Sequence, residues 1–259
     1  MSTLPSGRWL IAAALLGLSA RPAGADITAH TCHVGPTGGA VLRLTDFNPR
    51  GGAQPCTGFE VTVGGKRTSR GRLGFPGSGV FLSTADGRTV IFVQSRPYIS
   101  DRGALAGTPG VVFFRDGKEL ASYTIGELVE RPHAVMWSKS HAHWVGGLDE
   151  GQGEPYAVPE ATWALQTTSL RRITFDTATG RIVRAEDAPP WDECDLIARG
   201  QVVRSGGVLE FHPTSVLKGE LAVPVPLPPS AEMLEGSFET VCLARAADGV
   251  RFIRKLGQR

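Results

Sequence analysis

Two histidines separated by one residue, His141 and His143, have the spacing in this sequence that best suits a metal ion. Side chains alternate between the two faces of a strand, so residues i and i+2 point to the same side and two imidazoles can share one ion. The acidic residues that follow, within 149–154, lie in a glycine-rich loop that fixes no third ligand. We expect a structural pair packed beside neighbouring tryptophans and no cofactor, and a zinc or copper site is the alternative that this spacing allows.

A second group of metal-binding side chains, His30, Cys32 and His33, lies close to the start of the chain. Thiolate and imidazole together suit copper or zinc, and cleavage of the chain after Ala25 would add a free amine. A disulfide between Cys32 and Cys56 would remove the thiolate and leave only the two histidines. The metal site and the disulfide are therefore alternatives.

Motifs for nucleophilic or phosphate chemistry are missing from the sequence. The Gly-Ser-Gly at 77–79 lacks the spacing of a nucleophile elbow, the Gly-Gly-Lys at 64–66 lacks the upstream glycine of a phosphate loop, and no H-E-x-x-H occurs. Adjacent acids such as Asp192 and Glu193 would diverge on a strand, which does not suit paired acid and base roles. We expect a protein that is not an enzyme; a hydrolase of unrecognised type is the alternative.

The charge of the chain argues against a nucleic-acid partner. Lys and Arg number 27 and Asp and Glu 25, and removal of residues 1–25 takes away Arg8 and Arg21, which makes the two counts equal. Nucleic acids bind to clustered positive charge. The densest basic run, at 66–72, is expected at a solvated hairpin tip. A protein or envelope-surface partner is the expectation that remains.

The first 25 residues have the pattern of a secretory signal peptide. Arg8 precedes an apolar run at 9–18, and small residues follow at 23–25. The run is too short to cross a membrane, and no later segment approaches the necessary ~20 apolar residues. We expect cleavage near Ala25, a periplasmic or secreted location, and no transmembrane segment.

Export favours disulfides between the four cysteines, since an oxidising compartment keeps them paired. Four cysteines allow three pairings. The pairing of Cys32 with Cys56 and of Cys194 with Cys242 closes the shortest loops, and we favour it.

Turn dipeptides, mostly Asp-Gly, Thr-Gly and Gly-Gly, separate short apolar or alternating segments, which is typical of antiparallel hairpins. Asp-Gly is favoured in type I′ turns, which need positive φ at both central residues, so we expect that turn type at the Asp-Gly pairs. The predicted hairpins pair 80–83 with 89–94, 111–115 with 119–123, 172–175 with 181–184, 201–204 with 208–211, and 240–245 with 250–255. One short helix is expected where Thr124 and Glu127 have capping-box spacing and Pro132 ends the segment. The fold class is therefore all-β, with an antiparallel sheet or sandwich in the N-terminal part.

A domain boundary is expected near 185–191, where Pro189 and Pro190 interrupt the pattern of strands. This gives a β-rich domain at 26–187 and a small module at 188–259. A module of this size is near the lower limit for an independent core, so a Cys194–Cys242 disulfide would help it to fold.

The small module begins Cys-Asp-Leu-Ile-Ala-Arg-Gly-Gln-Val-Val at 194–203 and continues through Thr-Ser-Val-Leu-Lys-Gly at 214–219. It resembles the netrin-like OB-fold group, which includes the tissue inhibitors of metalloproteinases and many bacterial exported proteins. The resemblance implies a five-stranded barrel that presents a face or loops to a partner. Those inhibitors chelate zinc with an N-terminal cysteine, and Cys194 is internal, so that mode of action does not carry over.

The middle of the chain, at 82–88, 113–119 and 173–180, resembles hairpin units of uncharacterised exported bacterial β-proteins. No strict repeat occurs, so an open sheet or sandwich is expected rather than a propeller. The sequence thus predicts an exported, non-catalytic binding protein of the bacterial envelope or medium. The main alternative is a periplasmic metal-binding protein that uses His141 and His143.

Overall fold

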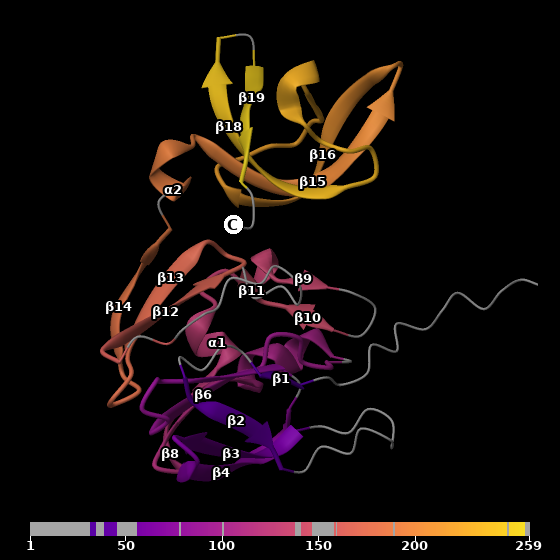
Figure 1. Cartoon of the computed structure of the whole chain (residues 1–259). Coiled ribbons are helices and arrows are strands. Elements are labelled where there is room, and N and C mark those ends of the chain that lie inside the picture. Colours follow the sequence, from indigo (N-terminus) through magenta and orange to yellow (C-terminus); the bar gives the residue numbers. More distant parts are fainter. Residues whose placement is uncertain are drawn as a thin grey trace, which may run out of the picture.

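The computed structural model describes most of the chain between Cys32 and Leu256 (Figure 1). The described residues are 32–34, 39–45, 56–77, 79–99, 101–137, 141–146, 158, 160–188, 190–247 and 249–256. The predicted signal peptide at 1–25 and His30 lie outside them. Of Cys32, His33 and Cys56 only the backbone is described, so their predicted disulfide or metal ligation is not tested.

The centre of the N-terminal part is a five-stranded sheet whose three inner strands are buried on both faces. Its strands, in spatial order, are β1 (Cys32–Val34), β5 (Gly79–Ser83), β6 (Thr89–Val93), β7 (Pro109–Arg115) and β8 (Lys118–Thr124). β1 runs parallel to β5, and the other neighbours are antiparallel. Every residue of β5 and β6 is buried, which is why these segments form continuous apolar runs instead of alternating patterns.

A second sheet covers one face of this central sheet. It is a meander of β2 (Val41–Leu44), β3 (Cys56–Val63) and β4 (Lys66–Gly77). Phe59 from β3 packs against Phe81 and Phe114 of the central sheet, with ring centroids 5.7 and 5.0 Å away. These aromatic side chains form the first core of the protein.

A third sheet covers the opposite face. Its order is β11 (Val145–Gly146), β12 (Thr162–Thr167), β13 (Arg171–Asp176) and β14 (Ile182–Asp187). Along β12 exposed and buried residues alternate, and the buried Trp163 contacts Phe175 and Phe113. Successive residues of the central strands thus serve two different cores, and the N-terminal part is a three-layer β structure.

The predicted helix is confirmed as α1 (Ile125–Leu128), where Thr124 and Glu127 form a reciprocal capping box. The sequence predicted no other helix, whereas the structure has a second turn, α2 (Pro190–Glu193), at the expected boundary. Proline suits the first turn of a helix because its missing N–H has no helical partner there. Single 3₁₀ turns occur at η1 (Arg102–Gly107), η2 (Pro132–Ala134) and η3 (Pro229–Ala231).

The C-terminal part is a nearly closed, barrel-like sheet of five strands, as predicted. Its order is β17 (Val225–Pro226), β16 (Val208–Lys218), β15 (Leu196–Ser205), β18 (Phe238–Ala246) and β19 (Gly249–Lys255). The outermost strands, β17 and β19, come into contact. At Gly200 a Cβ atom would lie 2.0 Å from the carbonyl oxygen of His212, so only glycine allows β15 to pass β16 this closely.

The hairpin turns agree with the prediction in one case and differ in another. Asp116 and Gly117 both have positive φ, 51° and 82°, as a type I′ turn requires. At Asp86 and Gly87 only the glycine has positive φ. The carboxylate of Asp86 instead accepts hydrogen bonds from the Thr84 hydroxyl and the Arg88 amide, at 2.6 and 3.0 Å, and holds a longer loop. The type I′ prediction was therefore wrong at this hairpin.

The N-terminal part and the barrel share a small apolar core. Ala134 and Leu170 from the first pack with Ile197, Leu217 and the Cys194–Cys242 disulfide of the second. These contacts join η2 and the turn between β12 and β13 to strands β15, β16 and β18 of the barrel.

Trp191 of α2 reinforces this joint. The guanidinium of Arg131 lies 3.9 Å from the centre of the Trp191 ring, and the ammonium group of Lys218 lies 5.8 Å from it. The same Lys218 ammonium donates to the carbonyl oxygens of Trp191 and Cys194, at 2.6 and 2.8 Å. One aromatic ring thus contacts cations from both parts of the chain.

Candidate functional site

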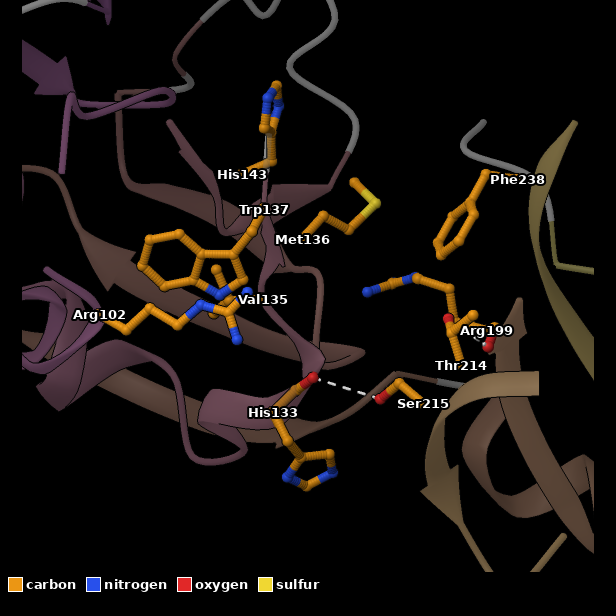
Figure 2. Close-up of a pocket in the computed structure, with 10 residues that line it drawn as sticks. All are labelled: Arg102, His133, Val135, Met136, Trp137, His143, Arg199, Thr214, Ser215 and Phe238. Carbon is orange, nitrogen blue, oxygen red and sulfur yellow. Dashed lines mark hydrogen bonds between the residues drawn. The ribbon is translucent and has the colours of Figure 1, made fainter. Parts of the chain in front are cut away.

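A cleft of about 600 Å³ lies between the N-terminal part and the barrel (Figure 2). The N-terminal part lines it with Arg102, His133, Val135, Met136, Trp137 and His143. The barrel lines it with Arg199, Thr214, Ser215 and Phe238. This volume falls within the range of about 300–1,000 Å³ that is typical of small-molecule sites, which also tend to occur between domains.

The N-terminal wall is built from short elements at the edge of the three-layer structure. The two-residue strands β9 (Met136–Trp137) and β10 (Ala142–His143) pair with each other and follow η2. Arg102 of η1 places its guanidinium 5.2 Å from the centre of the Trp137 ring. This wall therefore presents an aromatic ring with a cation beside it, together with the half-buried side chains of Met136 and His143.

The barrel wall comes from three neighbouring strands. Phe238 begins β18 and is 52% exposed, which is high for so large an apolar side chain. Ser215 of β16 donates a hydrogen bond of 3.2 Å to the carbonyl oxygen of His133 and ties the two walls together (Figure 2). The cleft thus has a fixed base and an apolar ring at its opening.

Arg199 is the most unusual residue of the cleft, because it is a charged side chain that is only 7% exposed. Its Nε donates to the hydroxyl of Thr240 at 3.1 Å, and Nη2 donates to the carbonyl oxygen of Thr168 at 3.0 Å. Nη1 donates to the carbonyl oxygen of Ala134. None of these acceptors is charged, and burial lowers the pKa of Arg199 to about 10. The guanidinium therefore stays charged at neutral pH in a desolvated place.

The charges around the cleft have one sign. Among the described residues that line it there are two arginines and two histidines, and there is neither an aspartate nor a glutamate. Arg102 and Arg199 carry permanent positive charge, whereas His133 and His143 gain it only when protonated. The cleft favours a negatively charged ligand.

The structure gives His141 and His143, the pair that could share a metal ion, different surroundings. His141 is buried, with its ring edge-on to Tyr98 at a centroid distance of 5.7 Å, and His143 is half-buried and lines the cleft. Within the described ranges, no cluster of three or more His, Cys, Asp or Glu side chains could hold a metal ion. The zinc or copper site at His141 and His143 stays a prediction.

Sequence reasoning missed the cleft residues Arg102, Trp137, Arg199 and Phe238. A signal was present for one of them, since Arg199 interrupts the apolar run Leu-Ile-Ala of a buried strand. A charged residue in such a run is rarely buried unless it has a specific partner. Arg102 and Trp137 belong to short elements, and Phe238 is the first residue of β18, and no periodicity predicts that these three positions meet at one cleft.

Comparison with family models, with curated proteins and with solved structures finds no match to this chain. The netrin-like resemblance of the C-terminal module therefore stays a prediction. Among the described residues, no helix is both long enough and apolar enough to cross a membrane. What the fold and the cleft define is a two-part, all-β protein with a positively charged site at the joint.

Proposed function

We propose that this chain is an exported, non-catalytic binding protein whose ligand is held in the cleft between the three-layer part and the barrel. The observation that carries the proposal is the cleft itself, which is lined from both parts and fixed by the hydrogen bonds of Arg199 and Ser215. A preformed, concave site with a few placed polar groups is typical of ligand binding.

The chemistry of the lining supports binding. Arg102 and Arg199 supply charge and hydrogen-bond donors, and Trp137 and Phe238 supply aromatic surface. Arginine and large aromatic residues are the types that contribute most at binding interfaces. The expected role of the barrel, which is to present a face to a partner, agrees with the exposed position of Phe238.

The proposal of export depends on the sequence at 1–25. Mass spectrometry of native protein should find a mature chain that begins near Asp26, immediately after the small residues of the cleavage site. Native protein that retains an intact leader would contradict the exported location, but not the cleft.

A capture experiment tests the binding function. The mature protein is crosslinked to its partners in the envelope and the medium of its host, and the crosslinked partners are recovered with it. Three forms are compared, which are the wild type, Phe238→Asp in the cleft, and Val183→Asp as the control. Val183 is 57% exposed on the edge strand β14 and does not line the cleft. Val183→Asp therefore replaces an exposed apolar side chain with an acidic one, as Phe238→Asp does, but away from the cleft. We expect the partners captured by wild type to be lost with Phe238→Asp and kept with Val183→Asp. Equal capture of the partners by all three forms would show that they do not bind in the cleft, and would contradict the proposal.

A further inference from the structure

We propose that the cleft binds an organic carboxylate, with its carboxylate group on Arg199 and its apolar body against Met136 and Phe238. This inference rests on the proposed binding function and specifies the chemistry of the ligand. It depends on the hydrogen bonds of Arg199, the charge of the cleft and the apolar surface at its opening.

The hydrogen bonds of Arg199 are incomplete. A guanidinium has five N–H groups, and those of Arg199 that bond within the described residues are one on Nε, one on Nη1 and one on Nη2. One N–H remains on each terminal nitrogen. Each of these two donors can bond to an oxygen of a carboxylate. Figure 2 shows the Arg199 side chain reaching from the barrel toward the N-terminal wall.

The charge of Arg199 is also uncompensated. A buried cation is costly unless an opposite charge accompanies it, and the acceptors of Arg199 are two carbonyl groups and one hydroxyl group. The described lining offers no carboxylate. A bound anion supplies the missing charge, and Arg102, over the Trp137 ring, adds a second positive group to the same cleft.

The rest of the lining favours an apolar body over a purely inorganic anion. Met136 and Phe238 lie on opposite walls of the cleft in Figure 2, and Val135 and Trp137 continue the apolar surface on the N-terminal wall. A phosphate group has more charge and more oxygens, and it is usually held by several donors, such as a glycine-rich loop or a helix N-terminus. The two remaining N–H groups of one arginine suit a carboxylate better.

A carboxylate with an apolar body has two sources, which are a small aliphatic acid and the free C-terminus of a peptide that ends in an apolar residue. Isothermal titration of the mature, full-length protein compares them directly. The probes are octanoate with octanol as its neutral analogue, and a tetrapeptide ending in leucine with its C-terminal amide. Inorganic phosphate is titrated as the anion without an apolar body.

We expect at least one free acid to bind with 1:1 stoichiometry and to bind roughly tenfold or more tightly than its neutral analogue, because charge-assisted hydrogen bonds depend on the ionised group. Octanoate alone would identify an aliphatic acid, and the tetrapeptide alone would identify a peptide C-terminus. The inference is overturned if neither acid binds, if acids and neutral analogues bind equally, or if phosphate binds most tightly.

Variants place the ligand in the cleft. Arg199→Lys keeps the positive charge but loses the fork, and Phe238→Ala removes the apolar wall. Both variants should bind the acid roughly tenfold more weakly than the wild type does. Arg251→Gln is the matched control, since Arg251 is exposed on β19 beside Ala244, about 20 Å along β18 from Phe238. Unchanged affinity in Phe238→Ala would also contradict the inference.

Arg199 is part of the joint between the two parts, so Arg199→Lys is used only if its circular dichroism matches wild type. If it does not fold, Arg102→Gln takes its place, because Arg102 lines the cleft and is exposed. Loss of partner capture in Phe238→Asp without binding of either acid would leave the binding function standing and remove only this ligand class.

Discussion

Arg199 of the barrel strand β15 donates a hydrogen bond of 3.0 Å to the carbonyl oxygen of Thr168, in the turn between β12 and β13 of the N-terminal part. A second bond from the same guanidinium reaches the carbonyl oxygen of Ala134 in η2. The side chain that gives the cleft its buried charge therefore also joins the two parts of the protein. The stability of the protein and the proposed binding of a ligand therefore depend on the same residue.

The first prediction follows from this coupling. Arg199→Met should lower the free energy of unfolding by about 2–4 kcal/mol, because two buried carbonyl groups lose their donor. Arg204→Met is the control, since Arg204 is exposed and pairs with Glu235 and with the carbonyl of Gly207, and it should cost about 1 kcal/mol or less. Urea denaturation measures both. Equal losses would show that Arg199 does not hold the joint.

The second prediction concerns the Cys194–Cys242 disulfide, which closes a loop of 48 residues and packs against Ala134 and Leu170. The double variant Cys194→Ser, Cys242→Ser should lose about 2–4 kcal/mol of stability, mainly because its unfolded chain is less constrained. Thermal unfolding with and without reductant measures this. Reductant should destabilise the wild type, and a wild type that is insensitive to full reduction would contradict the assignment.

Much of the fold could be predicted from local patterns. The capping box at Thr124 and the type I′ turn at Asp116 depend only on neighbouring residues, and both form as expected. The Asp86 turn failed because the hydroxyl of Thr84 and the amide of Arg88 compete for its carboxylate. These hydrogen bonds are also local, but the turn preference of the Asp-Gly dipeptide does not take the residues on either side of it into account.

The cleft could not be predicted, because its parts are far apart in the sequence. Arg199 bonds to Ala134, 65 residues away, and to Thr168, 31 residues away. Apolar runs such as 89–93 indicate burial but do not say that two different sheets cover the two faces of a strand. Hydrophobic periodicity defines faces and elements, and the stacking of layers depends on contacts that no local pattern contains.

The third prediction tests the contact between the β7–β8 hairpin and β4. Gly117 has φ of 82°, and an added Cβ would lie 2.0 Å from the carbonyl oxygen of Arg70. Gly117→Ala should therefore cost about 2 kcal/mol or more, both from backbone strain and from displacement of the neighbouring strand. Gly74→Ala is the matched control, since Gly74 has ordinary φ and open space around it, and it should change stability by about 0.5 kcal/mol or less. Similar effects of both changes would contradict the close approach.

The fourth prediction is a pH dependence at the same hairpin. Arg88 bonds to both oxygens of Asp116, at 2.9 and 3.0 Å, and this hydrogen bonding lowers the pKa of Asp116 below 3.8. A depressed carboxyl pKa stabilises the folded protein above the pKa of the unfolded chain. This contribution is lost as the pH falls through the lower, folded value. NMR titration of the carboxyl carbon should show the depressed pKa in wild type and a return toward 3.8 in Arg88→Gln. An unchanged Asp116 pKa in that variant would assign the shift to another cause.

The fifth prediction separates the binding protein from its metal-handling alternative through His141 and His143. His141 is 6% exposed and packs edge-on against Tyr98, so His141→Ala should lower stability by about 1–3 kcal/mol. His143 lines the cleft and is half-buried, so His143→Ala should cost less stability and should weaken binding of the carboxylate probe.

Elemental analysis of protein purified without a histidine tag completes the comparison. A carboxylate-binding cleft predicts the same substoichiometric metal content in wild type and in the double variant. One zinc or copper ion per chain that is lost with both histidines would replace the binding proposal with the metal site.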